Sequence, residues 1–181
     1  MKEIQYILTK TISVFIKGKK QKKRFINNWF RKQGVMIGDN CSIFCNVISS
    51  EPYMITIKDN VTISNNVQLI THDNSIIKVS NGEFTDLFGE IVIGNNCFIG
   101  AHSIILPGVK LCDNVIIAAG SVMTKSINEE FTVWGGNPAR KIGDWNSFYN
   151  NNKSFGINTS GMSYEEKKQM LIKSKSKLKV K

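Results

Sequence analysis

The sequence has few of the residues that build metal centres, disulfide frameworks and membrane spans. Its 181 residues include two histidines, four cysteines and three prolines, and no two cysteines form a Cys-x-x-Cys pair. A zinc site usually takes three or four His, Cys or carboxylate ligands, so we expect no required metal. The longest apolar runs are too short to cross a bilayer.

The cysteines and the N-terminal segment bear on the expected compartment. Lys10 interrupts the first apolar run, and no small-residue cleavage site follows it, so the segment does not resemble a secretory signal. We therefore expect reduced thiols in a cytoplasmic protein. The four cysteines are Cys41, Cys45, Cys97 and Cys112.

Acidic residues are scarce beside basic ones, 14 against 24, which gives a formal net charge of +10. Much of the excess lies in KGKKQKKR (17–24) and KSKSKLKVK (173–181). Such runs are compatible with solvated ends, with an anionic membrane surface or with a phosphate-rich cofactor. No helix-turn-helix, zinc-finger or RNA-recognition pattern accompanies them, so we do not expect a nucleic-acid partner.

What the sequence has in quantity is a six-residue repeat. The first position holds Ile or Leu in all ten units, and the fourth holds Asn or Gly in eight. The units are IGDNCS (37–42), IFCNVI (43–48), IKDNVT (57–62), ISNNVQ (63–68), LITHDN (69–74), IGNNCF (93–98), IGAHSI (99–104), ILPGVK (105–110), LCDNVI (111–116) and IAAGSV (117–122).

This period predicts an all-β solenoid. An aliphatic residue at every sixth position does not form a helix face, but it fits short strands that alternate with tight corners. Asn and Gly tolerate the positive φ that such corners require. Three faces close one coil of about 18 residues, and stacked coils bury their inward side chains only against each other. Cys41 and Cys97 occupy a small-residue packing position of the repeat.

The two ends have a different character from the repeat. We expect residues 1–34 to be a basic helical segment, residues 35–128 the solenoid, and residues 129–181 an exit segment with a basic helical tail. An apolar helix face in the first segment either caps the first coil or rests on a membrane surface. That face comprises Ile4, Ile7, Leu8, Ile12, Phe15 and Ile16.

The repeat, with NGEFTDLFGEIVIGNNCFIGAHSIILPGVKLCDNVIIAAGSVMTK and the later GGNPARKI, resembles the hexapeptide-repeat acyltransferases. The similarity is to the sugar O-acetyltransferases, including galactoside and maltose acetyltransferases, and to O-antigen and capsule acetyltransferases. It covers about residues 33–143. The resemblance implies a left-handed parallel β-helix, an acetyl-CoA donor and no acyl-enzyme.

The resemblance gives a role to His72. In the family the catalytic histidine comes just before a loop that leaves the β-helix, and residues 73–90 would be that loop. A neutral imidazole can take the proton of an attacking hydroxyl near pH 7. Spacing alone favours a corner residue in place of Asn at His72, and the resemblance is what favours catalysis.

Further site residues follow from the same resemblance. Asn46 would lie near the reacting carbonyl, although a plain turn residue is an equal alternative. His102 would be a corner or cleft-lining residue, and Asp73 would help to orient the cleft. The residues that would contact acetyl-CoA are Ala101, Ala119, Thr124, Lys125, Arg140 and Lys141; the two in NPARK lie near its phosphates.

The expected function is O-acetyl transfer to a sugar of a surface polysaccharide, close to the inner membrane, by a homotrimer with sites between subunits. One alternative is a small acceptor such as a xenobiotic, free sugar, serine or amino sugar. A non-catalytic scaffold is less well supported. A γ-type carbonic anhydrase would need three histidines, and the chain has two.

Overall fold

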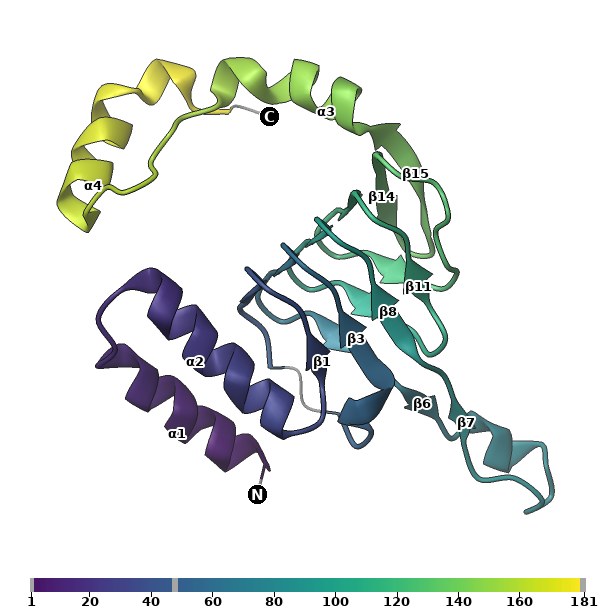
Figure 1. Cartoon of the computed structure of the whole chain (residues 1–181). Coiled ribbons are helices and arrows are strands. Elements are labelled where there is room, and N and C mark those ends of the chain that lie inside the picture. The colour runs from purple at the N-terminus through teal and green to yellow at the C-terminus, as the bar shows by residue number, and fades with distance from the viewer. Residues whose placement is uncertain (1, 47–48, 180–181) are drawn as a thin grey trace. The chain divides into compact units, whose positions relative to one another are not determined.

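Three sheets of mostly parallel strands form the centre of the chain (Figure 1). Between residues 55 and 123 the chain visits them in a repeated order: the first sheet, then the third, then the second. The computed structural model describes residues 2–46 and 49–179. The first sheet contains β1 (Met36–Ile37), β3 (Ile55–Ile57), β8 (Ile91–Ile93) and β11 (Lys110–Leu111). The second contains β5 (Gln68–Leu69), β10 (Ile104–Ile105) and β13 (Val122–Met123). The third contains β2 (Ser42–Ile43), β4 (Thr62–Ile63), β9 (Phe98–Ile99), β12 (Val115–Ile117), β14 (Thr132–Gly136) and β15 (Ala139–Asp144).

The strand register measures the length of each coil. Ile93 pairs with Leu111, 18 residues later, and β10 pairs with β13 at the same interval. The interval between Ile57 and Ile93 is 36 residues, because the chain leaves the stack between them. The interval from Ile37 to Ile57 is 20 residues, so this coil carries two extra residues.

The side chains that the six-residue period predicts to point inward are buried in the structure. The first-position residues of all ten units are buried. At the fifth position Val47 lies outside the described residues and Asp73 is exposed, whereas the other eight side chains are buried. Burial of one Ile or Leu side chain contributes about 1.5–3 kcal/mol, so the inward column supplies most of the apolar stabilisation. Cys41 and Cys97 belong to this column, which explains both thiols by packing.

The corners also follow the pattern. Positive φ occurs at the fourth position of eight units, between 55° and 82°. These residues are Asn40, Asn60, Asn66, Asn96, His102, Gly108, Asn114 and Gly120. His72 holds the same position in its unit, yet it is extended and belongs to β6 (His72–Asp73). The chain therefore turns no corner at His72 and leaves the stack instead.

The excursion lies between β5 and β8 and begins with β6. β6 pairs antiparallel with β7 (Leu87–Phe88), and the short 3₁₀ helix η2 (Ser75–Lys78) lies between them. Figure 1 shows this segment projecting away from the stacked strands. At its base the Gly89 amide donates to the Thr71 carbonyl at 2.9 Å. This bond joins the two ends of the excursion to each other.

Two helices precede the first coil, α1 (Lys2–Val14) and α2 (Lys19–Lys32). Ile26 and Phe30 of α2 enter the buried core beside the first coil. Tyr6 of α1 packs against the Phe30 ring at 5.6 Å, and its hydroxyl donates to the Cys45 carbonyl at 3.0 Å. Burial, followed by the nearby Cys45, raises the pKa of Tyr6 to about 12.

The apolar face expected to cap the first coil is not the one that packs. Ile4, Ile7, Leu8, Ile12 and Phe15 are 55–83% exposed. Thr9 and Ser13, from another side of α1, are buried. The expectation that the Ile4–Phe15 face of α1 packs on the first coil is therefore wrong. The apolar side chains that pack there come from α2.

The chain divides into two compact units, one ending at Ile142 and one beginning at Gly143. β14 pairs with β12 in parallel, which extends the third sheet beyond the expected boundary at residue 128. The second unit contains α3 (Trp145–Asn152), α4 (Tyr164–Lys173) and the 3₁₀ helices η3 (Lys153–Phe155) and η4 (Lys175–Lys177). α4 begins with a capping box between Ser163 and Glu166. Among the described residues, we find no helix both long and apolar enough to cross a membrane.

Candidate active site

His72 lies where the chain leaves the stacked strands. It follows the buried Thr71 and pairs with Phe88 across β6 and β7. The two rings are 5.9 Å apart at an interplanar angle of 50°. The imidazole side chain is 32% exposed, so it can meet a substrate. The corner interpretation of His72 is wrong, because its backbone is extended and does not have the positive φ of the corner residues.

A carboxylate holds the imidazole. His72 Nδ1 lies 2.9 Å from Glu51 Oε2, and the Glu51 side chain is only 13% exposed. Glu51 immediately precedes the 3₁₀ helix η1 (Pro52–Met54), within the coil that is two residues longer than the others. The two irregular parts of the repeat, the longer coil and the excursion, therefore meet in this pair.

Hydrogen bonds around the carboxylate form a closed network. Thr71 Oγ1 donates to Glu51 Oε2 at 2.7 Å, and Ser49 Oγ lies 2.6 Å from Thr71 Oγ1. The Glu51 amide donates to Ser49 Oγ at 3.1 Å. Since an ionised carboxylate only accepts, Thr71 and His72 Nδ1 must both donate to it. This direction assigns the hydrogen of a neutral His72 to Nδ1 and leaves Nε2 as a free base.

The same contacts set the charge of Glu51. Partial burial acts to raise the pKa of its carboxyl, but the hydrogen bonds from Thr71 and His72 outweigh burial. The net result is a pKa below the ordinary value of 4.5. Glu51 is therefore ionised at neutral pH and remains an acceptor for His72.

Asp73 has a different local role from its neighbour. Its Oδ1 accepts from the Ser75 amide at 2.8 Å, and this backbone bond is the main reason that its carboxyl pKa is lowered. The side chain is exposed and supports the first turn of the excursion loop. Among the contacts of the described residues, the carboxylate bonded to His72 belongs to Glu51 and not to Asp73.

His102 is a corner residue, as its position in the repeat predicts. Its φ is 60°, its side chain is exposed, and its Nε2 lies 3.4 Å from Asn66 Nδ2 in the preceding coil.

Asn46 is exposed and follows β2, next to residues 47–48, which the structure does not describe. The geometry around His72 thus rests on Glu51, which the sequence interpretation missed, rather than on Asn46. The only sequence signal for Glu51 was the irregular stretch between two repeat units.

The structure brings together part of the expected cofactor set. Lys125 and Arg140 line one pocket of about 310 Å³, together with Met123, Ser126, Trp134 and Ala139. Ala101 and Ala119 lie on adjacent coils, where the Gly120 amide donates to the Ala101 carbonyl at 2.8 Å. Thr124 is exposed beside the pocket but is not part of its lining.

Lys141 lies apart from that pocket lining. Its Nζ is 2.5 Å from Glu129 Oε1, which belongs to the proline-free segment TKSINEEF (124–131). The Lys141 ammonium group, which we expected to bind a cofactor phosphate, is therefore paired with Glu129. Within residues 2–46 and 49–179, no three His, Cys, Asp or Glu side chains are grouped so that they could hold a metal ion.

Comparison of the sequence with known proteins identifies the family of this chain. Residues 90–125 match the family model described as the hexapeptide repeat of succinyl-transferase. The chain is 39% identical to Protein CapG of Staphylococcus aureus over 158 residues, which cover 85% of this chain and 91% of that protein. The chain belongs to the hexapeptide-repeat acetyltransferase family.

Two further comparisons agree with this assignment. The chain is 39% identical to galactoside O-acetyltransferase of Escherichia coli K12 over 114 residues, 62% of this chain and about half (55%) of that protein. The crystal structure of the hexapeptide-repeat acetyltransferase VCA0836 of Vibrio cholerae, complexed with acetyl-CoA, covers 78% of this chain and 85% of its own, with a TM-score of 0.56 and 20% identity. At that identity the likeness concerns the fold alone. The predicted resemblance is confirmed, as is the assignment to an acyltransferase family.

Proposed function

We propose that this protein transfers the acetyl group of acetyl-CoA to a sugar hydroxyl, with His72 as the general base. The observation that carries the proposal is the bond between His72 Nδ1 and Glu51 at the point where the chain leaves the repeat. A partly exposed histidine that a carboxylate orients is equipped to accept a proton. Membership of an acetyltransferase family supplies the reaction class, and the likeness to galactoside O-acetyltransferase supports a sugar acceptor.

The proposed reaction needs no covalent enzyme intermediate. His72 Nε2 takes the hydroxyl proton while the sugar oxygen forms a bond to the acetyl carbonyl carbon. The tetrahedral intermediate then expels the thiolate of coenzyme A as the C–S bond breaks, and His72 returns the proton to that sulfur. Glu51 keeps the ring in one tautomer and stabilises the imidazolium that exists between the two proton transfers.

Phe88 and the loop give the acceptor a surface beside the base. The Phe88 ring lies next to His72 and is 58% exposed. An exposed ring of this kind can pack on the apolar face of a sugar while the sugar hydroxyls point to His72 and Asp73. Asn46 and His102 are the other acceptor contacts of the proposal.

The donor side of the proposal uses the pocket between β13 and β15. Lys125 and Arg140 would attract the phosphates of acetyl-CoA, because cationic side chains bind phosphate oxygens strongly. Ala101 and Ala119 leave room for the thin pantetheine arm between adjacent coils. Thr124 and Lys141 are further contacts, although Lys141 must first leave Glu129.

Architecture and location belong to the same proposal. The coils would form a left-handed β-helix over residues 35–128, with residues 1–34 and 129–181 as attached segments. Three chains would assemble around a three-fold axis, and each site would lie between subunits. The protein would act in the cytoplasm on a surface polysaccharide or its precursor, and the exposed face of α1 would contact the anionic inner membrane.

Incubation of the enzyme with acetyl-CoA and a panel of sugars and nucleotide sugars tests the reaction. Release of coenzyme A should depend on one class of sugar, and NMR of the product should place the acetyl group on oxygen. Acetylation of an amine in preference to a hydroxyl would contradict the proposal. Coenzyme A release without any dependence on an acceptor would also contradict it.

A further inference from the structure

The largest concentration of cations in the first unit lines a cleft that acetyl transfer does not use. The cleft has a volume of about 800 Å³ and lies between α2 and the turn that joins β1 to β2. Its volume is within the range of small-molecule sites. It is lined by Lys19, Lys20, Lys23, Arg24, Asn27, Asn28, Arg31, Gly38, Asp39, Asn40 and Cys41.

The charge in this cleft is unbalanced. Five of the lining residues are cationic, and Asp39 is the one acidic residue among them. Within the described part of the chain, none of the five cations forms an ion pair with a carboxylate. Like charges on one helix repel each other, and no acidic residue in the first turn of α2 offsets them. A bound anion would remove this cost.

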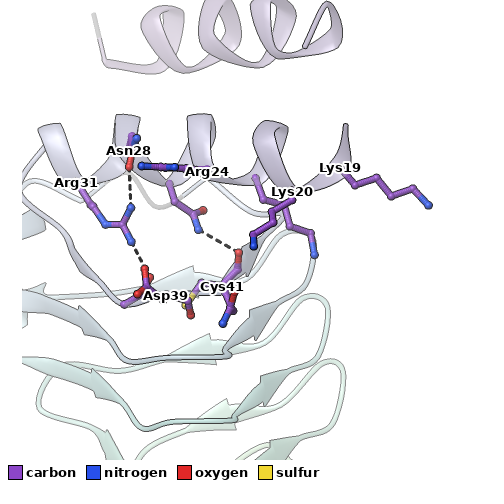
Figure 2. Close-up of a pocket in the computed structure, with 11 residues that line it drawn as sticks. Lys19, Lys20, Arg24, Asn28, Arg31, Asp39 and Cys41 are labelled. Atoms are coloured by element: carbon purple, nitrogen blue, oxygen red, sulfur yellow. Dashed lines mark hydrogen bonds between the residues drawn. The ribbon is translucent and has the colours of Figure 1, made fainter. Parts of the chain in front are cut away.

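Two of the cations are held in place by contacts that do not neutralise them. Arg31 donates from Nε to the Ile37 carbonyl at 2.8 Å and from Nη2 to the Gly38 carbonyl at 2.7 Å. Its Nη1 donates to Asn28 Oδ1 at 2.7 Å, and Lys23 Nζ donates to Ser42 Oγ at 2.5 Å. Figure 2 shows Arg31 joining α2 to the turn below it, with Lys19 extending outward. Two of the five cations are therefore held in place before any ligand arrives.

The cleft also contains an unmet polar group. Asn27 is 5% exposed and donates from Nδ2 to the Cys41 carbonyl at 3.0 Å. Its buried Oδ1 has no hydrogen-bond partner among the described residues. A buried acceptor without a donor costs free energy, and a small side-chain movement would let a ligand hydroxyl supply that donor.

We propose that this cleft binds a diphosphate group that carries a hydroxyl-bearing substituent. Several cations spaced along one wall fit an extended dianion better than a single carboxylate. Two sources have this chemistry: a soluble nucleoside diphosphate or nucleotide sugar, and a lipid-linked diphosphate headgroup. The site is separate from the His72 site and goes beyond the proposed acetyl transfer, on which it does not rest.

Binding of inorganic pyrophosphate and of uridine diphosphate, measured by calorimetry, tests the site. The double substitution Lys20→Gln with Arg24→Gln removes two cations that make no hydrogen bond among those found for the described residues, so the fold should persist. We expect it to weaken binding of both ligands about tenfold or more. The matched control, Lys17→Gln with Lys32→Gln, removes the same charge from residues outside the cleft lining and should change binding less than twofold.

Three outcomes would overturn the proposal. Equal weakening by both double variants would show a general effect of net charge. Weakening by Lys125→Gln with Arg140→Gln, and not by the cleft variant, would place the diphosphate in the other pocket. Absence of binding to these two ligands and to vesicles that contain a lipid diphosphate would leave the cleft without its ligand.

A vesicle experiment distinguishes the two sources. Cleft-dependent binding to vesicles that contain a sugar linked to a polyprenyl diphosphate, without binding to soluble diphosphates, assigns the headgroup source. Cleft-dependent binding of the soluble ligands assigns the nucleotide source. Acetyl transfer to a simple sugar should be unchanged in the cleft variant, so the outcome for the cleft is independent of the outcome for His72.

Discussion

At the residue scale, the proposed catalysis depends on the hydrogen bond between His72 and Glu51. His72 is visible in the sequence because the repeat breaks there, whereas Glu51 is not, because its place follows from how two coils stack. The structure brings them within 2.9 Å across 21 positions of the chain. A single sequence can show where the six-residue repeat is interrupted. It does not show which two interruptions lie next to each other in the folded chain.

Replacement of Glu51 by Gln should slow the reaction without preventing binding. The amide keeps the size of the side chain but no longer offers the charge that stabilises the imidazolium. We expect kcat to fall about 10–100-fold, by analogy with other residues that orient a functional histidine. The control is Glu90→Gln, which removes a carboxylate from an exposed ion pair with Lys110. Steady-state kinetics with a coenzyme A binding measurement would check this, and equal effects of the two variants would contradict it.

The lowered pKa of Glu51 gives stability a defined pH dependence. A carboxyl with a folded-state pKa below its unfolded value contributes stability that is present above pH 4.5 and is lost as the pH falls through the folded pKa. The difference in Tm between wild type and Glu51→Gln should therefore be largest near neutral pH and should shrink below pH 4.5. Thermal melts between pH 3 and pH 7 would measure it. A difference that grows on acidification would refute this assignment.

At the scale of elements, the repeat could be predicted almost in full. Ten inward aliphatic positions and eight corner positions follow from steric rules that act within six residues. The packing of the N-terminal segment could not be predicted in the same way. The more apolar face of α1 is exposed, because the choice of packing face depends on α2, through Ile26 and Phe30.

The inward column should dominate stability. Ile93 pairs with both Ile57 and Leu111 and is fully buried. Ile93→Ala should therefore lower the free energy of unfolding by about 2–5 kcal/mol, since it leaves a cavity between coils. Val92, the half-buried neighbour whose side chain points to the other face of the strand, is the control. Chemical denaturation should show a clearly smaller loss for Val92→Ala, and similar losses would contradict the inward assignment.

The base of the excursion loop has no room for a side chain at Gly89. A Cβ added to Gly89 would lie 2.2 Å from the Gly108 amide nitrogen, so the returning strand would have to shift. Since this strand holds Phe88 beside His72, Gly89→Ala should reduce kcat/KM at least about tenfold. Gly143→Ala is the matched control, because no atom lies within 4 Å of its added Cβ. Unchanged kinetics in Gly89→Ala would show that the loop position is not needed.

At the scale of the whole molecule, the assembly is the main open prediction. A homotrimer should have a molar mass of three times 20.4 kDa in light scattering after size-exclusion chromatography. It would bring three copies of the exposed loop side chains, among them Phe84 and Leu87, to subunit boundaries. A monomer that is fully active at low concentration would contradict sites shared between subunits.

The central claim is that His72 removes the proton of the acceptor hydroxyl. The direct measurement is kcat/KM for acetyl-CoA-dependent acetylation of the acceptor by wild type and His72→Ala, beside the dissociation constant for coenzyme A. If His72 is the general base, His72→Ala should lower kcat/KM about 10²–10⁴-fold and leave the dissociation constant unchanged. Full activity in His72→Ala, with coenzyme A still bound, would contradict it.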